Sequence, residues 1–192
     1  MIQLLCEELA KKIREARLAE QMVAGGLATV WKYNASEKRN KARYWDYIKK
    51  DHVNLIPDAD LAVLSFFEEV GPTRIHHGRE RHTGKYETDL RLICWANTDK
   101  GVLTPVLTEL LQKVFDKPFT STIFSAVTVT FTELLPEDDR LFARYEYSDA
   151  QRKFLQKPYD AFGLRAKVRF SICESVMHSG RQFDDSFSYS YL

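Results

Sequence analysis

Two stretches of the chain alternate strictly between apolar and polar residues, a pattern typical of strands with one buried face. Residues 162–173 place Arg165, Lys167 and Arg169 on the side opposite the apolar residues. Residues 125–134 repeat the pattern, with threonines opposite valine and phenylalanine. We therefore predict two half-buried antiparallel strands and a sheet with a polar, partly cationic face.

A long connection separates two further predicted strands. Residues 61–70 form an apolar run bounded by turn residues, which predicts a buried strand, and residues 85–97 alternate as its antiparallel partner would. Residues 71–84, between them, are rich in arginine and histidine. Hairpin connections usually have about two to five residues, and longer ones are often functional.

Two segments have helical spacing. Residues 2–24 carry apolar side chains on one face, and we expect Gly25 and Gly26 to end this amphipathic helix. Thr104 and Pro105 have the residue types of an N-cap and a first helical position, which predicts a second helix that ends near Asp116.

These elements predict an α+β fold, a mainly antiparallel sheet with a long β-hairpin, packed by an N-terminal helix and a central helix. We expect a single domain over residues 1–178, with a weak strand and then a loop-rich insertion at about 34–60. Within it, we expect an aromatic group to anchor the loop to the body, the alternative being a contact surface for another chain; the group consists of Tyr44, Trp45 and Tyr47, followed by Ile48. Residues 179–192 lack a core pattern and predict an extended arm, whose aromatic side chains are Phe187, Tyr189 and Tyr191.

Composition narrows the function classes. The chain has 192 residues, of which 44% are hydrophobic, and a formal net charge of +1, so any binding of nucleic acid requires a local patch. Cys6, Cys94 and Cys173 are odd in number and lie in apolar patterns, which favours reduced thiols and assembly in a reducing cytoplasm. No leader or membrane-spanning pattern is evident, and we expect no membrane partner.

The histidines of the long connection are the strongest candidate metal ligands. His76, His77 and His82 lie near Glu80 and Glu87 in the sequence, and imidazole with carboxylate can bind zinc. Adjacent histidines on an extended chain point in opposite directions, and the neighbouring arginines repel a cation. We therefore expect a solvated basic loop and no cofactor.

No pattern indicates an enzyme. The sequence has no nucleophile elbow, no phosphate-binding loop and no dinucleotide fingerprint. Paired acids such as Glu68 and Glu69 leave open a magnesium-dependent nuclease, although adjacent carboxylates are more often a solvated surface. We predict a non-enzymatic protein.

Nucleic-acid binding is the alternative function. The basic residues of the long connection, the run at 38–43 and the cations of the last strand could each contact phosphates without reading bases. No known nucleic-acid-binding motif accompanies them.

The order of these elements resembles the tail-terminator and neck or tail-completion proteins of long-tailed bacteriophages. The resemblance lies in the strands at 61–70, 85–97, 125–134 and 162–173, the helix at 104–116, and residues 145–170. It implies a virion protein that is assembled in the host cytoplasm and forms a ring at the tail end or neck. Such a ring stops growth of the tail tube and joins tail to head.

The resemblance implies partners of three kinds: copies of the same chain, tail-tube or portal-side virion proteins, and passing DNA through non-specific phosphate contacts. We expect the sheet cations Arg165, Lys167 and Arg169 and the three arm aromatics to be contact residues. The basic connection supplies the remaining predicted contact residues, Arg74, His76, His77, Arg79, Arg81, His82 and Lys85.

Overall fold

The computed structural model describes residues 1–32, 40–46, 49–76, 84–135, 141, 156–173 and 176. Its elements, in chain order, are α1 (Ile2–Ala16), β1 (Met22–Leu27), β2 (Thr29–Lys32), β3 (Asn40–Asp46), β4 (Asp51–Asn54), β5 (Val63–Glu69), β6 (Arg74–His76), β7 (Lys85–Asn97), the 3-10 helix η1 (Thr98–Lys100), α2 (Thr104–Val114), β8 (Phe124–Leu135) and β9 (Tyr159–Ile172).

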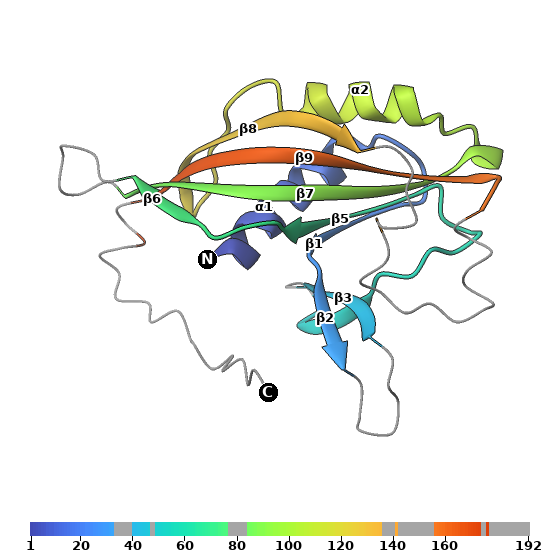
Figure 1. Ribbon diagram of the computed structural model, residues 1–192, viewed down its shortest axis with the longest axis horizontal. Helices are drawn as coiled ribbons and strands as arrows, with labels where there is room; N and C mark the ends of the chain where they lie inside the picture. Colours follow the sequence, from blue (N-terminus) through green and yellow to red (C-terminus); the bar gives the residue numbers. More distant parts are fainter. Residues whose placement is uncertain are drawn as a thin grey trace.

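The main sheet has six strands and is mostly antiparallel (Figure 1). Its order is β1-β5-β7-β9-β8, and β6 pairs with β7 beyond the end of β5. Only β1 and β5 pair in parallel. The long strands β7 and β9 pair over their whole length, from Lys85 opposite Ser171 to Asn97 opposite Tyr159. The predicted α+β class, the long hairpin and the two packing helices are confirmed.

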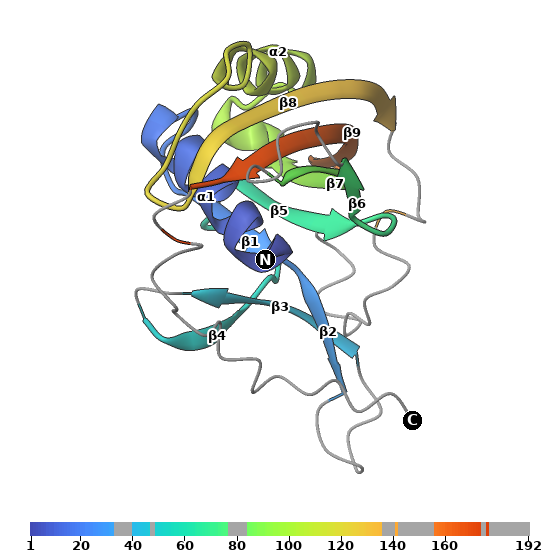
Figure 2. The ribbon, with the colours of Figure 1, turned by 90° about the vertical axis from the view of Figure 1, so that its left-hand side faces the viewer.

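Both helices lie on one face of this sheet (Figures 1 and 2). Helix α1 buries Leu5, Leu9 and Ile13 completely, which is the stripe that the sequence spacing predicts. Full burial of each such side chain stabilises the fold by about 1.5–3 kcal/mol. Alternate residues of the strands complete the core, so the predicted apolar faces of β7, β8 and β9 are confirmed.

A second, smaller sheet covers one end of the opposite face. It has the order β2-β3-β4 and lies below the main sheet in Figure 2. Tyr44 and Leu55 pack there against Ile93 and Trp95, in a separate buried cluster. Tyr44 is 7% exposed, which confirms its predicted anchoring role.

Two strands, β3 and β4, lie in the segment for which we predicted mainly loop. They are short and largely polar, so their pattern is too weak to distinguish from a loop in the sequence. Backbone pairing of β3 with both β2 and β4 stabilises them.

The predicted extent of the first helix is wrong. Helix α1 ends at Ala16, because Arg17 takes the left-handed conformation with φ 48° and its amide donates to the Arg14 carbonyl. Gly25 and Gly26 lie instead in β1. A methyl group at Gly26 would lie 3.0 Å from Glu7 Oε2, so glycine allows the helix to approach the strand.

Helix α2 begins one residue earlier than predicted. Leu103 is its N-cap, and Thr104 is the first helical residue, followed by Pro105. The Thr104 hydroxyl lies 3.3 Å from Asp160 Oδ2, to which it donates. Among the described residues, no helix is long and apolar enough to cross a membrane.

Candidate functional site

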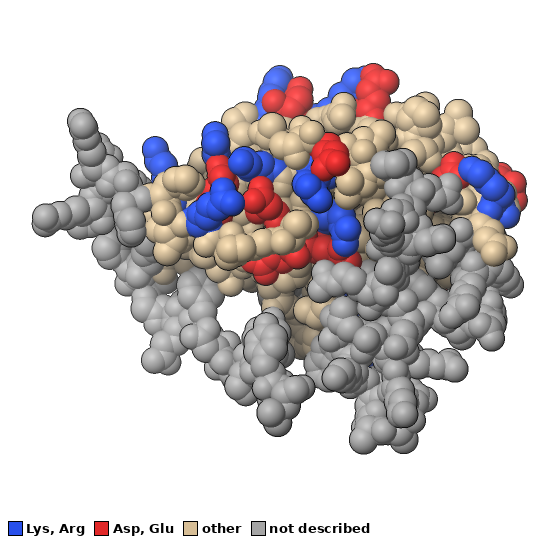
Figure 3. Space-filling view, in the orientation of Figure 1, with Lys and Arg blue, Asp and Glu red and all other residues tan. Residues whose placement is uncertain are grey.

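The face of the main sheet opposite the helices carries a cluster of charged and hydroxyl side chains, which we call the polar face. In Figure 3 these charges gather over β7, β8 and β9. Strand register places its members in rows across the sheet, because directly opposed residues share a face. The polar face consists of Glu68, Arg74, His76, Lys85, Glu87, Asp89, Arg91, Thr128, Thr130, Glu133, Arg165, Lys167, Arg169 and Ser171.

Glu87 is the centre of an ion-pair cluster. Arg169 donates from Nε to Glu87 Oε2 at 2.7 Å, and the Lys167 ammonium lies 3.5 Å from Oε1. Arg74 approaches the same carboxylate at 3.8 Å. The hydrogen bond from Arg169, together with the nearby charges, lowers the pKa of Glu87, although its burial acts in the opposite direction.

Two further pairs neutralise the middle of the polar face. Arg91 donates from Nε to Glu68 Oε2 at 2.9 Å and from Nη2 to the same oxygen, and Glu68 is only 2% exposed. Arg165 lies 3.2 Å from Glu133, with both side chains about half exposed.

The predicted cationic strand face is therefore present but is not purely cationic. Arg165, Lys167 and Arg169 share one face, as predicted, and their side chains are 47%, 37% and 70% exposed. Each cation pairs with an acid, Glu133 or Glu87, from a neighbouring strand. The sequence alternation placed Glu87 on the polar side of its strand, but gave no sign that Arg169, 82 residues away, lies beside it.

The basic connection is described only at its two ends. Arg74 and His76 lie on β6 and Lys85 begins β7, so these three predicted contact residues lie together at one end of the polar face. Residues 77–83 lie outside the described residues, and with them the predicted contact residues His77, Arg79, Arg81 and His82. The aromatic residues of the predicted arm, Phe187, Tyr189 and Tyr191, also lie outside the described residues.

Comparison with known proteins does not assign the chain to a family. No protein-family model matches it, and no curated protein matches it. The function must be argued from the geometry.

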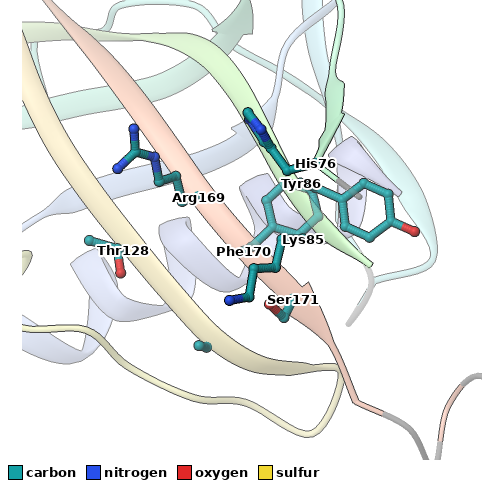
Figure 4. Close-up of a pocket in the computed structure, with 8 residues that line it drawn as sticks. His76, Lys85, Tyr86, Thr128, Arg169, Phe170 and Ser171 are labelled. Carbon is teal, nitrogen blue, oxygen red and sulfur yellow. The ribbon is translucent and has the colours of Figure 1, made fainter. Parts of the chain in front are cut away.

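A hollow of about 320 Å³ lies at the β6 end of the polar face, where β6, the start of β7, the end of β9 and the first half of β8 lie in that order across the sheet (Figure 4). Tyr86 and Phe170 are among the residues that line it, and their rings stack with centroids 5.3 Å apart. Its polar lining consists of His76, Lys85, Thr128, Arg169 and Ser171.

The buried cysteines are poor nucleophiles. Cys6 and Cys94 are completely buried, and desolvation raises the pKa of both thiols far above its usual range. Within the described ranges, no group of three or more histidine, cysteine, aspartate or glutamate residues is placed to hold a metal ion.

The outer edge of β8 is open over part of its length. Val127 exchanges two backbone hydrogen bonds with Phe119, at 2.8 and 3.0 Å, on the side away from β9. Since hydrogen bonding alternates along an antiparallel strand, Val129 and Phe131 direct their backbone N–H and C=O groups to the same side. In the part of the chain that the structure describes, no backbone group pairs with them.

Proposed function

We propose that this chain is a non-enzymatic structural subunit of a tailed-phage virion, which forms a ring in the neck or at the tail end, stops tube growth and joins tail to head. The observation that carries the proposal is the outer edge of β8 at Val129 and Phe131, which no backbone group pairs with in the described part of the chain. An exposed strand edge is a ready site for pairing with a second chain.

The two sides of the main sheet differ, which suits a head-to-tail contact. At the β1 side, Arg14 donates to the Ala24 carbonyl at 2.6 Å and pairs with Glu7, also at 2.6 Å, so helix α1 covers part of that edge. At the β8 side, Val129 and Phe131 pair with no backbone group of the described residues. A contact between unlike surfaces produces a closed ring when the rotation between subunits divides a full turn.

The order of elements also supports the proposal. The resemblance to tail terminators and neck proteins rests on the order of the elements. The chain has helix α1, the strands β5 to β7, helix α2, and the strands β8 and β9 in that order.

The alternative function, a nucleic-acid-binding module, depends on positive charge that the polar face leaves without an opposing acid. In the rows that contain Asp89 and Arg91, acidic and basic side chains are equal in number. The excess of basic side chains lies in the two rows next to the hollow.

A single substitution tests the proposed edge contact. Val129→Pro removes an N–H group that points away from β9, so the pairing of β8 with β9 is retained while the edge is blocked. Val129→Ala is the matched control, because it shortens the same half-buried side chain but keeps the N–H group.

Mass by light scattering after size exclusion gives the readout. We expect the parent chain and Val129→Ala to form a multi-subunit species and Val129→Pro to remain monomeric with an unchanged circular dichroism spectrum. An assembled Val129→Pro would show that the β8 edge is not the contact.

A further inference from the structure

We propose that the hollow at the end of the polar face is an anion site that takes a phosphate group, through Lys85 and Arg169 with the hydroxyls of Thr128 and Ser171. This inference does not depend on the proposed ring, since it rests on charge and donor placement within one chain.

Charge balance along the polar face is the first argument. Asp89 faces Lys167 in one row, and Glu68 and Glu133 match Arg91 and Arg165 in the next. The two rows at the β6 end differ, because one acid, Glu87, faces the three cations Arg74, Lys85 and Arg169. Positive charge is therefore in surplus at this end alone among the described rows.

The donors that line the hollow are available. Lys85 makes no ion pair with any described residue, and Arg169 uses only its Nε atom toward Glu87. The hydroxyls of Thr128 and Ser171 donate no hydrogen bond to a described group. A bound anion would thus form new hydrogen bonds without breaking existing ones.

The arrangement of the donors favours phosphate over carboxylate. They come from three neighbouring strands, β7, β9 and β8, that lie side by side along the hollow (Figure 4). A tetrahedral phosphate presents oxygens in several directions, whereas a carboxylate presents two in one plane. The hollow, at about 320 Å³, lies at the lower end of the size range of small-ligand sites.

Glu87 sets the position of Arg169 in this site. Its carboxylate is 5% exposed and holds the Nε atom of Arg169, which leaves the two terminal nitrogens of the guanidinium for the anion. His76, on the neighbouring β6 strand, lines the same hollow and adds a further donor.

Calorimetric titration of the full chain with pyrophosphate, at fixed ionic strength, tests the site. We expect Lys85→Gln to weaken binding about tenfold or more, as loss of one charged hydrogen bond does. The control, Lys117→Gln, removes the same charge from an exposed position after α2 and should bind like the parent chain.

A second titration, with a short DNA duplex, identifies the source of the phosphate. If a short DNA duplex also binds, Lys85→Gln should lower the slope of log K against log salt by about 0.9, and the phosphate is that of a nucleic-acid backbone. If pyrophosphate binds and the duplex does not, the site serves a small phosphate compound.

Three results would overturn the proposal. They are no heat of binding with millimolar pyrophosphate, equal binding by the parent chain and Lys85→Gln, and competition by acetate as strong as that by phosphate.

Discussion

The pair formed by Glu68 and Arg91 offers a quantitative test of the polar face. Arg91→Met keeps most of the apolar stem of the side chain but removes both nitrogens that donate to Glu68 Oε2. The carboxylate of Glu68 stays 2% exposed, so water cannot fully replace the lost donors.

Removing one partner of a buried ion pair costs about 3–5 kcal/mol of unfolding free energy. Arg91 itself is 21% exposed, so we take the lower end, about 3 kcal/mol. For a chain of this length, each 1 kcal/mol lowers the melting temperature by roughly 2–4 °C, so we expect a decrease of about 6–12 °C.

Urea denaturation followed by tryptophan fluorescence measures the loss of unfolding free energy, and a thermal melt measures the decrease in melting temperature. Two comparisons isolate the cause. Lys113→Met breaks the exposed pair with Glu109 on α2 and should leave the midpoint unchanged. Glu68→Gln combined with Arg91→Met should recover much of the loss, because the buried group is then uncharged. An Arg91→Met variant as stable as the parent chain, with the same m-value, would refute the reasoning.

Two other predictions concern Glu87 and the thiols. Because Arg169 lowers the folded-state pKa of Glu87 below its ordinary value, this carboxylate stabilises the fold at neutral pH, and the contribution is lost as the pH falls through that pKa. The difference in unfolding free energy between the parent chain and Glu87→Gln should therefore decrease on acidification. Chemical denaturation at about pH 7 and at about pH 3 measures it, and a difference independent of pH would contradict the assignment. For the thiols, we expect a thiol reagent to modify Cys173 in the native protein but Cys6 and Cys94 only after denaturation, and fast reaction of all three in the native state would contradict the burial of the latter two.

Alternation in the sequence was enough to predict the faces of the long strands. The apolar residues of 162–172 lie on the helix-covered side with Val127, Val129 and Phe131, and the cations lie on the other side with Thr128 and Thr130. A register shift after Phe131 ends the alternation in β8. This succeeds because one face of each strand is buried, so a shift by one residue would expose the whole apolar set.

Tertiary pairing could not be predicted in the same way. The parallel pairing of β1 with β5 and the placement of Glu87 beside Arg169 depend on strands far apart in the sequence. Gly25 and Gly26 were interpreted as a helix end, since glycine often has that role, whereas Gly26 in fact allows close packing of α1 on β1. Local propensity does not distinguish these two uses of glycine.

For the candidate site, the sequence predicts Arg74, His76 and Lys85 as contact residues, but it does not predict the hollow that His76 and Lys85 line. Thr128 and Ser171 carried no signal of their own, because hydroxyl side chains are common on any solvated strand. The hollow depends on the register of β7, β9 and β8, which only the folded structure provides.

Negative-stain electron microscopy of the purified full chain, on the single peak from size exclusion, tests the proposed function most directly. The account predicts closed rings of several subunits with a central opening. A population of single-subunit particles at the highest soluble concentration, with no rings, would contradict it.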